Sequence, residues 1–158
     1  PAGGEDLRNW VERRYLLSLG LREVHIYDRD PDPARPGVAK YQSVVDAINA
    51  RGDGSIGLLT RKQAMENYLH WDAVVDAARH DLGIEITLSP WSDTDDVPKQ
   101  CVEVLRGNRL PCNCKAWINR HAIRHMTMSH VKERGAESEV QQWFDAILTG
   151  RLDGNQEG

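Results

Sequence analysis

The chain has 158 residues, of which 40% are hydrophobic and 28% charged, and its formal net charge is -4. This length suits one domain with a continuous core, and the acidic balance excludes a generic nucleic-acid coat protein, whose surface is strongly basic. No apolar run approaches the ~20 residues that span a bilayer. The opening segment lacks both Met and a signal-peptide core, so we expect a piece of a longer protein. Three cysteines, an odd number, favour a reducing, cytoplasmic compartment.

The N-terminal part of the chain alternates between helical and strand patterns. The expected elements are a helix over 6–19, a strand over 23–27, a loop over 31–37, a helix over 38–50 and a strand over 56–60. Apolar residues at helical spacing indicate the helices, and short apolar runs bounded by Gly, Pro and Asp indicate the strands. Strand, helix and strand with short connections predict a βαβ unit with parallel strands and a right-handed crossover.

The remaining patterns are mostly helical. We expect helical segments over 62–70, 71–81, 97–105, 115–125 and 137–148, a strand or extended connection over 84–88, a mobile acidic loop over 89–96 and a disordered tail from Asp153. The predicted organisation is an N-terminal helix over 1–20, an α/β core over 21–110, C-terminal helices over 111–152 and a tail over 153–158.

Asp28 and Asp30 lie directly after the predicted strand over 23–27, just before a proline-broken loop. Because side chains alternate between the faces of a strand, residues two apart point the same way. Two carboxylates at this spacing suit a hard divalent cation such as Mg²⁺, which takes oxygen ligands. Open α/β sheets bind ligands at the carboxyl ends of their strands, so we expect a metal site here. The alternative is a solvated acidic turn.

Glu66 is a third acidic candidate, and it follows the predicted strand over 56–60. Parallel strands bring their carboxyl ends to one edge of a sheet. We therefore expect the carboxylates of Asp28, Asp30 and Glu66 to meet around one or two Mg²⁺ ions. The alternative is a glutamate on a helix surface that pairs with Arg61 or Lys62.

Two strings that contain these acidic residues carry a resemblance to a known family. HIYDRD over 25–30 is followed by a proline-broken loop and then by TRKQAMENYLH over 60–70. In this order they resemble the Toprim domain of overcoming-lysogenisation-defect (OLD) type ATP-dependent endonucleases, and the similarity runs from about Glu23 to Ile147. The resemblance implies a Toprim-like, Rossmann-like parallel sheet and DNA cleavage with Mg²⁺ or Mn²⁺. It also implies an ATPase module in the same chain or on a partner and a role in phage defence. A homodimer is a further expected partner, although the sequence does not give the oligomeric state.

Carried onto this sequence, the metal-binding residues of the family fall on Asp28, Asp30 and Glu66. The resemblance also implies a lysine near the scissile phosphate, for which Lys115 is the first candidate and Lys132 the second. The family's first strand and the acidic residue after it have no counterpart upstream of Asp28, and no Walker-type phosphate loop is present. We therefore expect an incomplete Toprim core that folds but lacks full nuclease activity as this fragment.

A zinc site is a competing interpretation of Cys112, Cys114, His121 and His125. Thiolate and imidazole are the ligands that zinc prefers, and the two histidines lie four residues apart on one predicted helix. The Cys-x-Cys spacing departs from the usual Cys-x₂₋₄-Cys pattern. Two half-buried thiols and two surface histidines are therefore the alternative.

Basic residues gather in the C-terminal helices and in the first helix. They are Arg120, Arg124, Lys132 and Arg134, together with Arg13 and Arg14. Such a cluster is expected to line a path for DNA, and the alternative is an ordinary solvated helix face.

Three classes of function remain open from the residues and the resemblance. The first is a divalent-metal-dependent DNA endonuclease or nickase that hydrolyses phosphodiester bonds and is coupled to an ATPase module. The second is a non-catalytic interaction or regulatory module that docks on an ATPase partner. The third is a small helical domain stabilised by zinc, which would unfold when the metal is chelated.

Overall fold

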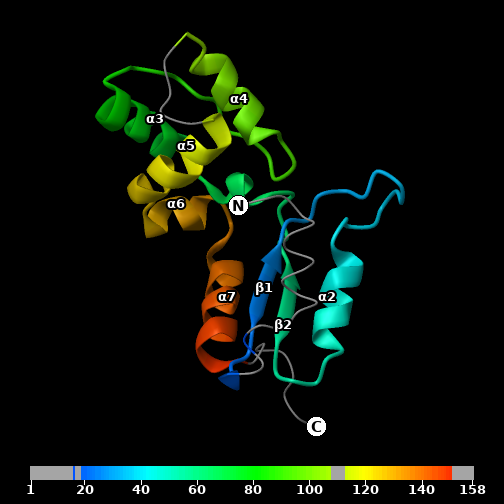
Figure 1. Cartoon of the computed structure of the whole chain (residues 1–158). Helices are drawn as coiled ribbons and strands as arrows, with labels where there is room; N and C mark the ends of the chain where they lie inside the picture. Colours follow the sequence, from blue (N-terminus) through cyan, green and yellow to red (C-terminus); the bar gives the residue numbers. More distant parts are fainter. Residues whose placement is uncertain (1–15, 17–18, 108–112, 151–158) are drawn as a thin grey trace. The chain divides into compact units, whose positions relative to one another are not determined.

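The computed structural model describes residues 16, 19–107 and 113–150 and shows a mixed α/β chain with a small parallel sheet (Figure 1). The chain divides into two compact units. The first unit contains the residues up to Arg61 together with those from Val140 onward, and the second unit is Lys62–Glu139. Each unit is described by itself below.

The first unit is built on the predicted βαβ arrangement. Strand β1 (Val24–Tyr27) pairs in parallel with β2 (Ile56–Leu59), in a register that runs from Val24 opposite Ile56 to Tyr27 opposite Leu59. Helix α2 (Gln42–Asn49) connects the two strands. The predicted strands and their parallel pairing are confirmed, and the Toprim-like fold remains a proposal.

Helix α2 begins later than the predicted residue 38. Ala39 forms an isolated antiparallel bridge with Pro31, and the Lys40 amide donates to the Asp30 carbonyl at 2.8 Å. Residues 38–40 are therefore a bend, a bridge and a turn rather than helix, and they close the proline-broken loop before the helix starts. The apolar face of α2 then packs on the strands through Val45 and Ile48.

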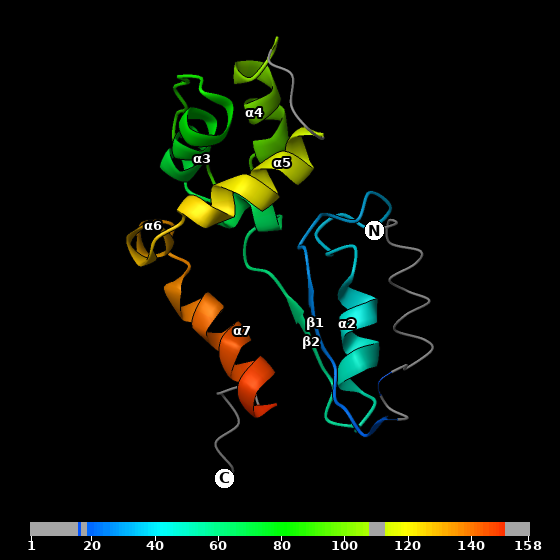
Figure 2. The same ribbon diagram turned by 60° about the vertical axis from the view of Figure 1, so that its left-hand side comes forward.

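The C-terminal part of α7 (Glu137–Thr149) belongs to the first unit. Arg22 donates from Nη1 to the Thr149 carbonyl at 2.9 Å and from Nη2 to the Leu148 carbonyl at 3.1 Å. The last carbonyls of a helix have no partner inside it, so this arginine caps the end of α7. Figure 2 shows this part of α7 and α2 on opposite sides of the two strands.

The second unit is helical. In chain order it contains a 3₁₀ turn η2 (Met65–Tyr68), α3 (Trp71–Ala77), a π-helical turn η3 (Ala78–Leu82), α4 (Val97–Val104), α5 (Cys114–His121), a 3₁₀ turn η4 (Ala122–His125), α6 (Met128–Glu133) and the start of α7. The predicted helices over 97–105, 115–125 and 137–148 are confirmed. Helix α6 begins after Thr127, whose hydroxyl accepts from the His130 amide at 3.2 Å as an N-cap.

The core of the second unit forms where α3, α4 and α5 pack together. Its most deeply buried members include Val74, Val97, Trp117 and Ile118, each 0% exposed. Because α4 and α5 share this core, the second unit cuts across the predicted ranges 21–110 and 111–152.

The segment over 84–96 differs from both expectations for it. Residues 84–88 are an extended connection rather than a strand of the sheet, with Ile84, Ile86 and Leu88 packed on the core. Residues 89–96, predicted to be a mobile loop, contain Trp91, which is 3% exposed. Asn67 Nδ2 donates to the carbonyls of Ser92 at 3.1 Å and Asp95 at 3.0 Å. Part-buried hydrogen bonds therefore hold a segment whose polar composition indicated mobility.

Two expectations lie outside the described residues: the predicted helix over 6–19, of which only residues 16 and 19 are described, and the tail from Asp153. Within the described ranges, no helix combines the length and apolar character needed to cross a bilayer.

Candidate functional site

Asp28 and Asp30 follow directly after β1, at its carboxyl end, and both are half-buried. The backbone between them is held by Thr60, which directly follows β2. The Arg29 amide donates to the Thr60 hydroxyl at 3.0 Å, and Arg29 Nε donates to the Thr60 carbonyl at 2.6 Å. The Thr60 amide in turn donates to the Tyr27 carbonyl at 2.9 Å. The acidic pair thus stands on a backbone that is bonded to the neighbouring strand end, as a preorganised ligand pair requires.

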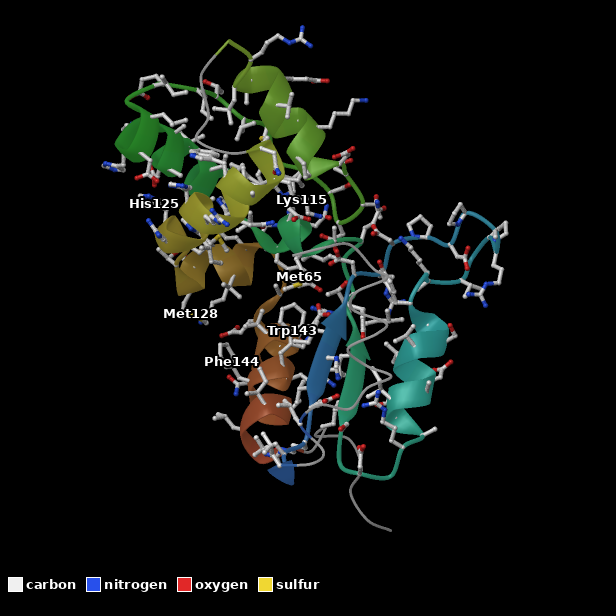
Figure 3. All side chains as sticks on the ribbon, viewed as in Figure 1. Met65, Lys115, His125, Met128, Trp143 and Phe144 are labelled. Atoms are coloured by element: carbon white, nitrogen blue, oxygen red, sulfur yellow. The ribbon has the colours of Figure 1, made fainter. Side chains whose placement is uncertain are left out.

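Glu66 lies in η2 of the second unit, and it is 1% exposed. Its Oε1 accepts a hydrogen bond from Asn119 Nδ2 at 2.6 Å and lies 3.2 Å from Lys115 Nζ. Both partners come from α5, and Figure 3 labels Lys115 on that helix and Met65 in the η2 turn. The structure therefore brings together two of the residues singled out in the sequence, Glu66 and Lys115.

The alternative of an exposed Glu66 paired with Arg61 or Lys62 does not hold for this carboxylate. Glu66 is buried, and the ammonium of Lys62, itself buried, forms an ion pair with Asp93. A tight 3₁₀ turn rather than an amphipathic helix presents Glu66, so the helical spacing that places side chains on one solvated face does not apply.

The second carboxylate oxygen of Glu66 differs from the first in its hydrogen bonding. Within the part of the chain that the structure describes, Oε2 is buried and makes no hydrogen bond. Buried carboxylate oxygens are almost always bonded, and an exception calls for an explanation such as a bound ion or water, strain or a catalytic role. A hard divalent cation takes carboxylate oxygens as ligands, so this oxygen fits the metal that the sequence predicts.

Asp28 and Asp30 belong to the first unit and Glu66 to the second, so their sharing of one ion stays a prediction. Among the described residues, no group of three or more His, Cys, Asp or Glu side chains is arranged to hold a metal ion. The carboxylates that the structure characterises are therefore the half-buried pair after β1 and, separately, Glu66 with its partners on α5.

The four basic residues predicted to contact DNA have different environments. Arg120 and Arg124 are exposed, and Lys132 is exposed and lies 3.4 Å from a carboxylate oxygen of Glu137. Arg134 is buried at 9% exposure, and burial lowers its pKa against the opposing effect of the nearby aspartates. Its guanidinium is used inside the unit, which is a correction to the expectation of a DNA-contacting side chain. The other two basic candidates, Arg13 and Arg14, lie outside the described residues.

The guanidinium of Arg134 bonds the segment over 91–93 to η2. Nε and Nη2 both donate to the Asn67 carbonyl, at 3.1 and 2.8 Å, and Nη1 donates to the Trp91 carbonyl at 2.8 Å. Nη2 also lies 3.2 Å from Asp93 Oδ1. Since Asn67 is the neighbour of Glu66, this network fixes the turn that presents the buried carboxylate.

Of the zinc candidates, Cys112 lies outside the described residues. Cys114 is buried in the helical core. His121 Nδ1 lies 2.7 Å from Asp81 Oδ2, and the His125 ring stacks on His80 with centroids 5.5 Å apart. The three described candidates therefore do not gather around one point, in agreement with the absence of a metal-binding group from the described ranges.

Sequence reasoning missed Asn119 and the internal role of Arg134. A signal for Asn119 was present, because it follows Lys115 by four residues and therefore lies on the same face of α5. Arg134 gave no such signal, since a helix-end arginine has the same local pattern whether it is buried or exposed.

No protein-family model, curated protein or solved structure matches this chain.

Proposed function

We propose that the chain is the metal-binding part of a divalent-metal-dependent DNA endonuclease or nickase of the Toprim type that OLD endonucleases use. The observation that carries this proposal is the buried Glu66 carboxylate, whose Oε1 is bonded to α5 and whose Oε2 makes no hydrogen bond among the described residues. The half-buried Asp28 and Asp30 at the carboxyl end of β1 support it independently.

The proposal gives each residue a role. Asp28, Asp30 and Glu66 would hold Mg²⁺ or Mn²⁺, as the carboxylate chemistry of the donors allows. A divalent cation, when bound, would supply activation of water and neutralisation of phosphate charge. The Lys115 side chain is 58% exposed, so its ammonium can turn toward a phosphate while remaining close to Glu66. A cation at that position stabilises the negative charge that develops on a phosphodiester during hydrolysis.

The test is conversion of supercoiled plasmid to nicked or linear DNA in Mg²⁺ or Mn²⁺, with EDTA as the metal-free reference. The protein in the assay is the full gene product, including any residues that the gene encodes before residue 1 or after residue 158. We expect metal-dependent cleavage, and losses of about a hundredfold or more in Asp28→Asn and in Glu66→Gln.

Asp46→Asn and Glu85→Gln are matched controls, because each neutralises an exposed carboxylate in the same unit as one of the tested residues. Cleavage that is equal in all five proteins would contradict the assignment. Metal binding without any cleavage would favour the interaction module, whose partner is an ATPase. Addition of ATP to the same reaction tests the proposed coupling to an ATPase module.

A further inference from the structure

The two oxygens of the Glu66 carboxylate have different partners. Asn119 Nδ2 donates to Oε1 at 2.6 Å, and Lys115 Nζ lies 3.2 Å from the same atom. Oε2 is buried and has no hydrogen bond within the described ranges. The carboxylate is therefore held at one oxygen, and the other has no hydrogen-bond partner among the described residues.

The position of Asn119 is set by the packing of α5. The two residues before it, Trp117 and Ile118, are each 0% exposed in the core of the second unit. The start of the helix is capped by Asn113, whose Oδ1 accepts from the Ala116 amide at 2.8 Å. A short helix that is capped and anchored in this way holds the Asn119 amide in a defined place. Its hydrogen bond then defines the rotation of the Glu66 carboxyl group.

We propose that Asn119 is a positioning residue, which orients Glu66 so that Oε2 is presented to a divalent cation. This inference rests on the proposed function, because it requires Glu66 to be a metal ligand. Groups that bond to a metal's ligands commonly change metal affinity by about 10- to 100-fold when they are removed. Asn119 is such a group for Glu66.

Lys115 contacts the same carboxylate, but its expected effect on metal binding is opposite to that of Asn119. The Asn119 amide is neutral, so it orients Glu66 without opposing a cation. The Lys115 ammonium carries a positive charge, and like charges repel at short range. Because the lysine is 58% exposed, solvent screens this repulsion and its effect is small. Loss of Asn119 therefore weakens metal binding, whereas loss of Lys115 slightly strengthens it.

The experiment measures Mn²⁺ binding directly, by electron paramagnetic resonance of the free ion during titration of the protein. The difference in Mn²⁺ affinity between the wild type and Glu66→Gln shows how far binding depends on Glu66. We expect Asn119→Ala to lower the Glu66-dependent Mn²⁺ affinity by about 10-fold. We expect Lys115→Met, which keeps the aliphatic stem, to strengthen it by about two- to fivefold.

Asn113→Ala is the matched control. It removes an asparagine from the same helix and costs helix stability through loss of the cap, yet Asn113 bonds to Ala116 rather than to Glu66. Thermal unfolding of all variants, followed by circular dichroism, shows which of them remain folded at the temperature of the titration. Mn²⁺ affinity like that of the wild type is expected for Asn113→Ala.

The outcomes separate this inference from the proposed function. If Glu66→Gln binds Mn²⁺ as the wild type does, Glu66 is not a ligand and both proposals are overturned at this residue. If Glu66→Gln loses binding while Asn119→Ala does not, the proposed function stands and the positioning role is overturned. Equal losses of Mn²⁺ affinity in Asn119→Ala and Asn113→Ala would assign the effect to helix stability and overturn the positioning role. Weaker Mn²⁺ binding in Lys115→Met would contradict the expected repulsion between the lysine and the cation.

Discussion

The side chain of Asn49 pairs with the backbone of Gly57 as a neighbouring strand would. Asn49 Oδ1 accepts from the Gly57 amide at 2.7 Å, and Asn49 Nδ2 donates to the Gly57 carbonyl at 3.1 Å. The last residue of α2 thereby satisfies both backbone groups of a β2 residue. A Cβ atom at Gly57 would lie 3.1 Å from Val45 Cα and 3.3 Å from Ile48 Cβ, so the close approach of α2 depends on glycine.

We predict that Asn49→Ala lowers the free energy of unfolding by about 1–3 kcal/mol, because two backbone groups of β2 lose their partners. Asn49→Asp should fall between the wild type and Asn49→Ala, since a carboxylate can accept from the Gly57 amide but cannot donate to its carbonyl. Urea denaturation of the three proteins measures the order. An alanine variant as stable as the wild type would show that water replaces the asparagine without cost.

Arg134 offers a test of the network that orders the segment over 91–93. We predict that Arg134→Lys lowers the free energy of unfolding by about 2–4 kcal/mol, because an ammonium cannot reproduce the forked bonds to the Asn67 and Trp91 carbonyls. Chemical denaturation measures the loss. Arg124→Lys is the control, since Arg124 is exposed and its replacement should change stability by about 0.5 kcal/mol or less. Equal effects of the two substitutions would contradict the structural role of Arg134.

We expect His70 to make the stability of the second unit depend on pH. The side chain is 1% exposed, its Nδ1 accepts from the Asp72 amide at 3.2 Å, and its ring stacks on His130 with centroids 4.5 Å apart. Burial and the neighbouring His130 lower the pKa of His70, against the opposing effects of Asp72 and Glu133. The folded state therefore favours the neutral imidazole. Its contribution to stability is complete above the unfolded pKa of about 6.5 and is lost as the pH falls through that value toward the lower folded pKa.

We predict that the wild type loses more stability between pH 7.5 and pH 5.0 than His70→Asn does. Asparagine keeps an acceptor at the N-cap position of α3 but does not titrate. Urea unfolding across this range gives the two pH dependences. His80→Asn, which replaces an exposed histidine, should retain the dependence of the wild type. Parallel curves for the wild type and His70→Asn would exclude His70 as the source.

Cys101 should be chemically inert in the folded protein. It is 0% exposed, and burial, with a smaller effect of Cys114, raises the pKa of its thiol to about 12. The thiolate is the reactive species, so at pH 8 only about one thiol in ten thousand is in that form. We predict that iodoacetamide leaves Cys101 unmodified in the native state and labels it in denaturant, as peptide mass spectrometry can show. Fast native labelling would contradict its burial.

Local sequence patterns determined several elements of this protein. Apolar periodicity and turn residues predicted β1, β2, α4 and α7, because these signals act over a few residues and do not depend on the rest of the fold. The candidate carboxylates Asp28, Asp30 and Glu66 were likewise identified from the sequence, as was Lys115.

The tertiary structure decided what the polar side chains do. Glu66 has the local pattern of a solvated glutamate, but packing of α5 against η2 buries it beside Asn119. Arg134 and the segment over 89–96 have the composition of exposed groups, but they bond to one another in the second unit. Burial and hydrogen-bond partners arise from residues far apart in the chain. A local pattern therefore specifies which group is present, and long-range packing specifies whether it faces water, another side chain or a ligand.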